Sequence, residues 1–455
     1  MAAPALSCTV DRAGPRPLPA QLADQVRAQV RSGALRPGSR LPSSRALARE
    51  LAVSRAVVEQ AWAQLLAEGW VESRAGSGTF VSAVPAAAPH PGRVAGPVPA
   101  PPPERVLLDS GTPWIDPRHR AAWRRAWREV SATVPPRGYD DPRGTRELRA
   151  LLAERLARTR GLEVGADDVV VVAGTSDGLR ELLGVLPPGP VAVEDPGYRA
   201  AVATVRAAGR AVVDLPAARP LASPDALAGL AAAYVTPAHQ HPLGVVMPAA
   251  QRVELLSAAR RSGSVVVEDD YDSEFRYDVA PVPALALLDR ERVAYLGTAS
   301  KSVSPSLRLG WLVPPPHLLD AVVAARDARH DAVPWPSQRA FTALLRDGYV
   351  DRVVRSARRV YAERAARVVA ALSPYAEPGG PTAGMYSTWL LPPARALAAR
   401  DAARAVGFEV PLLSAYARSS ELTGLLVGFG GLTDAELDAA LAALVAALRA
   451  LTPQL

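Results

Sequence analysis

A proline-rich segment at residues 83–104 divides the chain and restricts what it can fold into. Its sequence, AVPAAAPHPGRVAGPVPAPPPE, contains eight prolines and almost no large apolar side chain. Such a segment cannot form an apolar core, and its prolines favour the extended polyproline II conformation. At about 3.1 Å per residue, it could span up to roughly 70 Å. We therefore expect a semi-rigid linker between two folded parts; a proline-rich docking motif for a partner is the alternative.

The length and composition of the chain are typical of a protein with two or three globular domains. The chain has 455 residues, of which 49% are hydrophobic and 21% are charged, and a domain takes roughly 150 residues. No apolar run reaches the roughly 18 residues of a membrane span, and the N-terminus lacks a secretion signal. Cys8 is the only cysteine, which excludes an internal disulfide and a CxxC metal site. We expect a cytoplasmic protein without a metal.

The residues before the linker carry the pattern of a winged helix. Residues 22–33 have apolar side chains at a spacing of four and end in glycine, which predicts a helix. Residues 41–70 predict two further helices that each begin at a serine, with a turn of two residues between them. Residues 71–82, VESRAGSGTFVS, predict a hairpin with a basic, glycine-rich tip. Helix, helix-turn-helix and hairpin follow each other in the order of a winged helix.

The distribution of charge also sets this part apart. Residues 1–82 carry ten arginines and six acidic residues, whereas the whole chain has a net charge of +7. More than half of the positive excess therefore lies on less than a fifth of the chain. A basic module of this kind fits a polyanionic partner such as DNA.

After the linker, short apolar runs alternate with amphipathic segments. Runs of this kind are typical of a buried, mostly parallel α/β sheet with helices between its strands. The last hundred or so residues look mainly helical and predict a small α+β subdomain. The expected strands are 169–174, 191–195, 232–237, 265–270 and 293–297, and the expected helices are 146–160, 175–186, 198–208, 248–262, 346–372 and 434–450.

Polar residues gather where these strands end, which is the edge at which open α/β sheets bind ligands. Asp269 and Tyr271 follow one strand, Lys301 follows the next, and Thr175 begins a helix whose N–H groups can hold a phosphate. Lys301 is the only lysine among the 52 Lys and Arg residues, and an ammonium can lose its proton and attack a carbonyl carbon where guanidinium cannot. A lysine, a carboxylate, a phenol and a phosphate cradle are the parts that bind pyridoxal phosphate.

Both parts of the chain resemble known families. The stretch SGALRPGSRLPSSRALARELAVSRAVVEQAWAQLLAEGWVESRAGSGTFV resembles the winged-helix domain of the GntR regulators. The motifs RGYDDPRGTRELR, VEDPGY, YVTPAHQHPLG, VEDDYDSEFRY and GTASKSVSPSLRLGW resemble the fold-type I aminotransferase domain of the MocR subfamily. That subfamily joins the two domains through a long linker, and the resemblance covers nearly the whole chain from about residue 18.

The resemblance implies a multidomain fold, an α+β winged helix followed by an α/β aminotransferase-like domain with a small α+β C-terminal subdomain. It divides the chain into a flexible N-terminus at 1–17, a winged helix at 18–82, the linker at 83–104, and the aminotransferase-like domain at 105–455. Within that last domain we expect a large part at about 135–335 and a small part at about 336–455.

The resemblance also implies roles at a pyridoxal phosphate site. Lys301 is similar to the lysine that forms the internal aldimine, Asp269 to the aspartate that pairs with the pyridine nitrogen, and Tyr271 to the tyrosine near the ring hydroxyl. Tyr198 stands where an aromatic ring approaches the cofactor, with packing in the core as the alternative. The residues that resemble the phosphate cup are Thr298, Ser300, Arg308, Thr175 and Ser176.

One further tyrosine implies an assembly. Tyr139 resembles a tyrosine that reaches the phosphate of the other subunit in this fold, so that the resemblance implies a homodimer. Ordinary packing in the core is the alternative for this residue.

Three positions depart from the pattern of active aminotransferases. Leu426 stands where we place the arginine that binds the substrate carboxylate, and Ala200 stands where relatives can offer a second one. The chain has no asparagine, and His241 lies near the place of the asparagine beside the cofactor. Because a bidentate arginine is the usual way to orient a carboxylate, an amino acid would be poorly held.

These departures favour one of two functions. The first is a transcriptional regulator that senses pyridoxal phosphate itself, or an amine without a carboxylate, through the aminotransferase-like domain. The alternative is an active aminotransferase with a fused DNA-binding domain. A half-transamination would be compatible with sensing, so turnover is not excluded.

At the other end, the second helix of the helix-turn-helix should enter the major groove of operator DNA, and the hairpin should lie along a phosphate or in the minor groove. We expect salt-sensitive binding to double-stranded DNA, with Trp62, Leu65 and Leu66 in the core. The residues expected at the DNA are Arg45, Ser54, Arg55, Val57, Arg74, Ser77 and Gly78.

Overall fold

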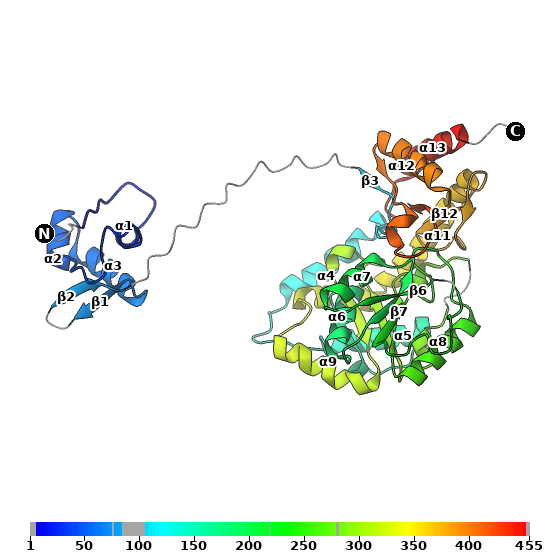
Figure 1. Ribbon diagram of the computed structural model, residues 1–455, viewed down its shortest axis with the longest axis horizontal. Coiled ribbons are helices and arrows are strands. Elements are labelled where there is room, and N and C mark those ends of the chain that lie inside the picture. The colour runs from blue at the N-terminus through cyan, green and yellow to red at the C-terminus, as the bar shows by residue number, and fades with distance from the viewer. Residues whose placement is uncertain (1–5, 75–76, 84–104, 218, 279–281, 452–455) are drawn as a thin grey trace. The chain divides into compact units, whose positions relative to one another are not determined.

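A computed structural model of the chain describes residues 6–74, 77–83, 105–217, 219–278 and 282–451. The chain forms two compact units, Met1–Pro101 and Pro102–Leu455, and each is described here by itself (Figure 1). The expected linker at 83–104 lies almost wholly outside the described residues.

The first unit has the elements of a winged helix. Its helices are α1 (Leu18–Arg31), α2 (Ser44–Glu50) and α3 (Arg55–Ala67), and its strands are β1 (Val71–Arg74) and β2 (Gly78–Val81). The Ser43 hydroxyl caps α2 by accepting a bond from the N–H of Ala46 at 3.2 Å, as expected of a serine at a helix start. Trp62 and Leu65 lie in the apolar core, but Leu66 is 47% exposed, so its expected place in the core is wrong. Leu66 lies on α3 beside the buried face that Trp62 and Leu65 share, on the side that faces solvent.

An extended segment before α1 packs against that helix. Leu6 is buried in the core of the unit, and the main chain of every second residue after it pairs with a glutamine of α1. Each glutamine accepts a hydrogen bond from a backbone N–H and donates one to the carbonyl of the same residue, at 2.6–3.3 Å. The pairs are Ser7 with Gln29, Thr9 with Gln25, and Asp11 with Gln21. In this glutamine ladder, the described residues of 1–17 differ from the flexible terminus that we expected.

The second unit is built on a seven-stranded sheet in the order β4-β10-β9-β8-β7-β5-β6. Strands β5 to β9 run parallel, and β10 is antiparallel to both β4 and β9. Each of the five strands expected from the sequence is present, and β6 and β10 are additional. The bounds are β4 (Val170–Val172), β5 (Val191–Asp195), β6 (Val212–Pro216), β7 (Ala232–Val235), β8 (Val265–Asp270), β9 (Val293–Thr298) and β10 (Gly310–Val313).

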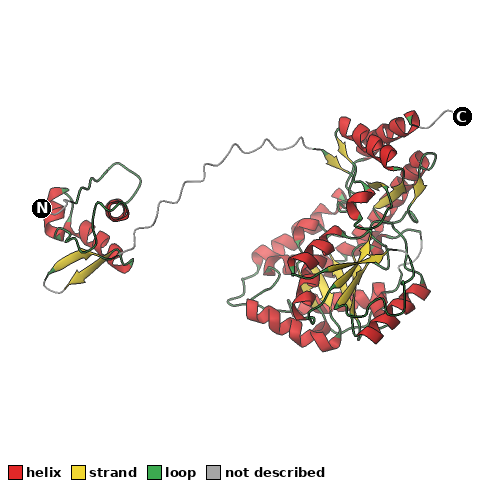
Figure 2. Ribbon diagram, viewed as in Figure 1, coloured by secondary structure: helices red, strands yellow, loops and turns green. Residues whose placement is uncertain are grey.

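Helices cover both faces of this sheet (Figure 2). Successive residues of each strand belong to two different apolar clusters, as expected where side chains alternate between two buried faces. The α-helices of this part are α4 (Arg120–Ala132), α5 (Arg146–Arg160), α6 (Thr175–Val185), α7 (Arg199–Ala207), α8 (Ala249–Ser262), α9 (Pro316–Arg329) and α10 (Trp335–Arg346). The 3₁₀ turns are η1 (Pro117–His119), η2 (Ala166–Asp168), η3 (Ser273–Phe275), η4 (Leu285–Leu287) and η5 (Pro305–Leu307).

The C-terminal residues form a small subdomain around the antiparallel sheet β11-β12-β14. The segment just after the linker joins it, because β3 (Val106–Leu107) pairs in parallel with β13 (Phe408–Glu409). Its remaining elements are α11 (Tyr349–Leu372), β11 (Glu377–Pro378), β12 (Tyr386–Leu390), α12 (Pro393–Ala405), η6 (Leu413–Tyr416), β14 (Gly424–Gly428) and α13 (Asp434–Ala450). Among the described residues, every helix is too short or too polar to cross a lipid bilayer.

Candidate cofactor pocket and DNA-binding surface

One pocket lies at the carboxyl ends of the parallel strands, where ligands of open α/β sheets bind. It brings together nine of the residues that the sequence assigned to pyridoxal phosphate, from segments up to 133 positions apart. Ser110, Gly111, Gly174 and His241 complete the lining. The nine are Thr175, Ser176, Tyr198, Asp269, Tyr271, Thr298, Ser300, Lys301 and Arg308.

Lys301 follows β9 and points its ammonium into the pocket region, where Nζ donates a hydrogen bond to the carbonyl oxygen of Gly111 at 2.7 Å. Burial lowers the pKa of Lys301, and the carboxylates of Asp109, Asp272 and Asp269 act in the opposite direction. A buried lysine with a lowered pKa is easier to deprotonate, which is what attack on an aldehyde carbon requires.

Asp269 is the second-last residue of β8, and only one of its two carboxylate oxygens accepts a hydrogen bond from a described residue. The Tyr234 hydroxyl donates a short hydrogen bond to Oδ2, whereas Oδ1 is buried without a partner among the described residues. Burial raises the pKa of Asp269 to about 7, and the nearby hydroxyls of Tyr234 and Thr175 act in the opposite direction. An orphaned carboxylate oxygen in a pocket calls for a donor, and the protonated nitrogen of a pyridine ring is a suitable one.

A cradle for a phosphate lies at the start of α6. Gly174 has a φ of 114°, and the Arg308 guanidinium lies 3.6 Å from where a β-carbon would stand at that glycine. The N–H groups of Thr175 and Ser176, at the first turn of the helix, have no acceptor among the described hydrogen bonds. Backbone N–H groups of a helix N-terminus and an arginine are suited to bind a dianion. The residues present therefore fit pyridoxal phosphate.

Tyr271 is tied to the small subdomain. Its hydroxyl lies 2.8 Å from that of Tyr386 in β12 and donates to the carbonyl oxygen of His239 at 3.1 Å. His239 Nδ1 in turn lies 2.7 Å from a carboxylate oxygen of Asp272. This network fixes the phenol at the mouth of the pocket.

Two sequence-predicted positions lie elsewhere. Tyr139 is 84% exposed and stacks on His330 with ring centres 4.5 Å apart, so it is neither a pocket residue nor a core residue within one chain. Leu426 is fully buried in β14, opposite Thr388 of β12, and does not line the pocket.

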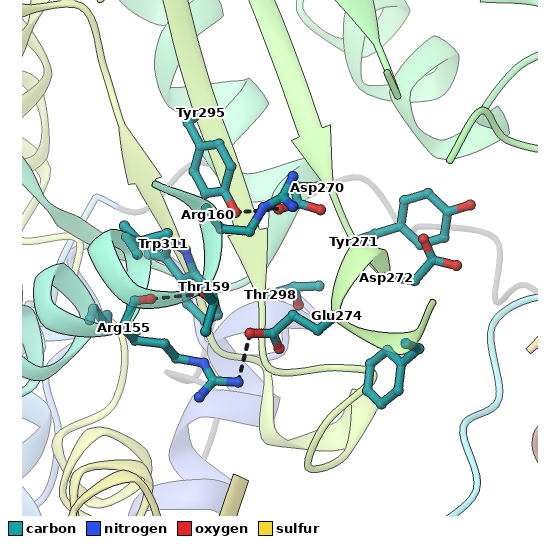
Figure 3. Close-up of a pocket in the computed structure, with 13 residues that line it drawn as sticks. Arg155, Thr159, Arg160, Asp270, Tyr271, Asp272, Glu274, Tyr295, Thr298 and Trp311 are labelled. Atoms are coloured by element: carbon teal, nitrogen blue, oxygen red, sulfur yellow. Dashed lines mark hydrogen bonds and ion pairs between the residues drawn. The ribbon is translucent and has the colours of Figure 1, made fainter. Parts of the chain in front are cut away.

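Behind the cofactor pocket lies a small cavity between α5 and strands β8 to β10 (Figure 3). Arg160 of α5 and Asp270 of β8 form a buried ion pair there at 2.5 Å, with the Tyr295 hydroxyl as a further donor to Asp270. Arg155 reaches Glu274 at 2.6 Å beside them. Since Asp270 directly follows Asp269, this pair holds the end of β8 from the face opposite the cofactor pocket.

Sequence reasoning missed two of the pocket residues. Ser110 and Gly111 come from the segment that follows the linker, and nothing in their local sequence links them to Lys301 almost two hundred positions away. His241, which the resemblance put near the place of the asparagine beside the cofactor, is among the residues that line the pocket.

The predicted DNA contacts lie on the surface of the winged helix. Arg45, Ser54 and Arg55 are exposed around α2 and α3, and Val57 is half-buried. Arg55 pairs with Glu59 at 2.6 Å. The wing residues Arg74, Ser77 and Gly78 are exposed as well, and Arg74 pairs with Glu72 at 2.6 Å and lies over Phe80; Ala75 and Gly76 are outside the described residues.

Arg40 is a cation at this surface that the sequence did not single out. It is exposed, and its Nε lies 3.2 Å from where a β-carbon would stand at Gly78 of the wing. Among the described residues it has no acidic partner, in contrast to Arg55 and Arg74.

Comparison with known proteins covers both units. Residues 18–81 match the family described as bacterial regulatory proteins, gntR family, and residues 104–444 match aminotransferase class I and II. The pyridoxine biosynthesis regulator PdxR of Corynebacterium glutamicum is 34% identical over 77% of this chain and 78% of its own. The probable rhizopine catabolism regulator MocR of Rhizobium meliloti is 35% identical over 78% and 77%.

Solved structures agree on the fold of the second unit. An archaeal alanine:glyoxylate aminotransferase superposes with a TM-score of 0.69 at 24% identity, covering 77% of this chain and 92% of that one. The kynurenine aminotransferase of Pyrococcus horikoshii gives a TM-score of 0.68 at 22% identity, with the same coverage. With a gntR-type winged helix before an aminotransferase-like domain that retains the cofactor set, the chain belongs to the MocR group of the GntR family, pyridoxal-phosphate-binding regulators of transcription that bind DNA.

Proposed function

We propose that this regulator senses a small molecule at the Lys301 pocket and changes its affinity for operator DNA in response. Bound pyridoxal phosphate would supply an aldehyde that reacts with amines. The effector is then either pyridoxal phosphate itself or an amine that reaches it. Because the operator is DNA of the cell, this function places the protein in the cytoplasm.

The observation that carries the proposal is a contrast between the groups that fit the cofactor and the position expected to bind a substrate carboxylate. The groups that fit the cofactor are assembled around one pocket, with a free Asp269 oxygen and a free helix terminus. The position expected to hold an amino acid's carboxylate is instead Leu426, packed in the core. A site that binds the cofactor well and a carboxylate poorly suits sensing better than transamination.

The roles that we propose are those that the resemblance implies, and they are supported by the position of these residues around one pocket. Lys301 binds the cofactor aldehyde carbon, Asp269 Oδ1 accepts from the pyridine nitrogen, and Tyr271 faces the ring oxygen. Tyr198 contacts the ring. The phosphate would be held by Thr175, Ser176, Thr298, Ser300 and Arg308.

We further propose a homodimer in which Tyr139 completes the pocket of the partner subunit. The support is the resemblance of Tyr139 to a tyrosine that reaches the other subunit, together with its 84% exposure, which leaves the ring accessible to a partner. Light scattering should give twice the chain mass of 47.8 kDa. A monomer at micromolar concentration would contradict this assembly.

The target genes are a further proposal. One relative is named as a regulator of pyridoxine biosynthesis and another as a regulator of rhizopine catabolism, so that membership of the group does not settle the effector. With pyridoxal phosphate as effector, genes of vitamin B6 metabolism would be the natural target.

An active aminotransferase is the second candidate, favoured by the assembled cofactor groups. Since Leu426 cannot bind a carboxylate, another residue of the pocket would have to supply the cation that binds the carboxylate of the substrate. Mixing the cofactor-loaded protein with each common amino acid and an excess of a second oxo acid as amino acceptor would decide: sustained conversion of both supports the enzyme, and at most one equivalent of oxo acid from the amino acid supports the sensor.

Two measurements test the regulator. The visible absorbance of purified protein with added pyridoxal phosphate should show a lysine-bound band that is lost in Lys301→Ala and in Lys301→Arg, which keeps the charge but cannot react. The affinity for a labelled duplex, selected from random DNA with the full-length protein, is then measured with and without the cofactor and candidate amines. An affinity that stays the same under all these conditions would sink the sensing proposal, because coupling must appear as a change in affinity.

A further inference from the structure

The small subdomain packs two tyrosine rings, rather than an arginine, against His241, a residue of the pocket lining. The ring of His241 meets those of Tyr386 in β12 and Tyr416 in η6 at centre distances of 5.7 and 5.2 Å. Tyr198 and Tyr271 approach the same imidazole at 5.7 and 5.9 Å, all with edge-to-face geometry. These five rings form what we call the aromatic wall.

The segment that carries Tyr416 is anchored to the large sheet. Asp195 at the end of β5 accepts hydrogen bonds from three consecutive N–H groups, those of Arg418, Ser419 and Ser420, at 2.7–2.8 Å. The Arg418 guanidinium binds Asp214 and the carbonyl oxygens of Val193 and Glu194. Arg418 is therefore committed to structure and is not free to bind a ligand.

His241 is the polar group of the aromatic wall that has no partner. It is 5% exposed and lines the pocket, yet its ring nitrogens make no hydrogen bond with any described residue. Burial lowers the pKa of His241 to about 3, and the positive charges of Lys301 and His239 add to this effect. The ring is thus neutral at physiological pH and offers one donor and one acceptor to a ligand.

A carboxylate, that of Asp109, lies next to the lining residues Ser110 and Gly111. Asp109 lies two residues before Gly111, and its Oδ1 accepts from the N–H groups of Gly111 and Thr112 at 3.1 and 2.9 Å. Its carboxylate raises the pKa of Lys301, against a larger lowering by burial. It also raises the pKa of Tyr416, which burial raises further. It has no ion-pair partner among the described residues.

Cations are scarce in the same place. Arg308 is the arginine of the pocket lining and faces the phosphate cradle. Arg199 is exposed, with its guanidinium carbon 5.9 Å from the centre of the Tyr416 ring, and it lies outside the pocket lining, as do Asp109 and Tyr416. A ligand carboxylate entering the pocket would meet aromatic rings and Asp109.

We propose that the aromatic wall and Asp109 form a subsite for an amine that carries a second positive charge and no carboxylate, such as a short aliphatic diamine. One nitrogen reaches toward Lys301, and the second ammonium lies against the tyrosine rings near Asp109. Tyrosine faces attract cations, the carboxylate adds Coulomb attraction, and the neutral His241 ring can accept a hydrogen bond from the ammonium. This inference rests on the proposed function, because it names the effector class of the same pocket.

Three amines of matched length test the subsite: 1,4-diaminobutane, butylamine and 4-aminobutanoate. Calorimetric titration of the cofactor-loaded, full-length protein should rank the diamine first, about tenfold tighter than butylamine, as expected for a cation at an aromatic face beside a carboxylate. The aminobutanoate should bind most weakly. If it binds as tightly as the diamine, or if butylamine does, the subsite does not exist.

Variants separate the two parts of the subsite. Asp109→Asn keeps an acceptor for the two backbone N–H groups and should bring the diamine to the affinity of butylamine. Tyr416→Phe keeps the ring and should retain the preference, whereas Tyr416→Leu should lose about tenfold in diamine affinity. Tyr375→Leu, in the small subdomain but without the ring contact to His241 that Tyr416 makes, is the matched control. An unchanged diamine preference in Asp109→Asn would overturn the inference.

The two proposals fail separately. If the diamine binds as described but DNA affinity does not respond to any ligand, the subsite stands and the sensing function fails. If DNA affinity responds to pyridoxal phosphate while the three amines bind alike, the function stands and the subsite fails.

Discussion

Adjacent residues of β8 serve the two sides of the sheet. Asp269 lines the cofactor pocket, whereas Asp270 pairs with Arg160 in the cavity behind it. Arg160→Met should lower the free energy of unfolding by about 3–5 kcal/mol, because it leaves a buried carboxylate without its partner. Urea unfolding followed by tryptophan fluorescence would measure this. The double variant Arg160→Met with Asp270→Leu should recover most of the loss; a double variant as unstable as the single one would show that packing, not charge, was lost.

The pKa of Asp269 predicts a pH dependence for the cofactor-free protein. Burial raises that pKa to about 7 from its ordinary value of 3.8. Between these values, the folded state holds a proton that the unfolded chain has released, so stability falls as pH rises from about 4 to about 7. The melting temperature should therefore decline over this range, less steeply in Asp269→Asn. Glu194 and Glu268, whose pKa values burial also raises to about 7, act in the same direction and set the remaining slope.

Pyridoxal phosphate should counter this decline, because a cationic ring nitrogen is a partner for the ionised Asp269. The gain in melting temperature on adding the cofactor should grow from about pH 5 to about pH 7. A gain that is the same at both pH values would contradict the pairing of Asp269 with the ring nitrogen.

At the scale of elements, the glutamine ladder extends the winged helix toward the N-terminus. Gln25→Ala removes two hydrogen bonds to Thr9 and should lower the free energy of unfolding of this unit by about 1–3 kcal/mol. Gln60→Ala, an exposed glutamine of α3 without a described hydrogen bond, is the control and should change stability by less than about 0.5 kcal/mol. Equal stability of the two variants in chemical denaturation would show that the segment contributes nothing.

The elements that the sequence predicted share a strong pattern, and those it missed do not. Strands such as 265–270 are wholly apolar before their polar ends, and Ser43 stands at a true helix cap. Strand β6, VVDLP, lies at the sheet edge and is only partly buried, and β10 has four residues. Helix α4 reads RAAWRRAWREVSA, with so many arginines that its buried stripe is narrow. Short or edge elements depend on tertiary contacts, which local sequence does not encode.

The candidate site was predictable to the extent that its residues end strands. Lys301, Asp269 and Thr175 follow apolar runs, and parallel strands bring their carboxyl ends to one edge. No strand pattern could place Ser110 and Gly111, which follow the linker, or Tyr416, which belongs to the small subdomain. The glutamine ladder was equally hidden, since a helix with glutamines at a spacing of four looks like any solvated face.

At the scale of the whole molecule, recognition of DNA depends on which arginines of the basic unit lack an acidic partner. Arg55 and Arg74 are paired with acids, while Arg40 and Arg45 have no acidic partner among the described residues. Replacing Arg40 or Arg45 with glutamine should make the slope of log K against log salt less negative by about 0.9, the effect of one lost phosphate contact. Arg36→Gln, exposed four positions before Arg40, is the control for net charge. A slope changed equally by all three would indicate nonspecific attraction only.

The solitary Lys301 gives the chain an unusual protease map. An endoprotease specific for lysine has one peptide bond to cut, after Lys301, and that bond lies beside the pocket in the folded domain. Cleavage into fragments 1–301 and 302–455 should therefore report local opening of this segment, with no background from the rest of the chain. The rate of appearance of two bands, measured on the cofactor-free protein, would read out how often the segment opens; pyridoxal phosphate bound to the Lys301 amine would itself block recognition by the protease.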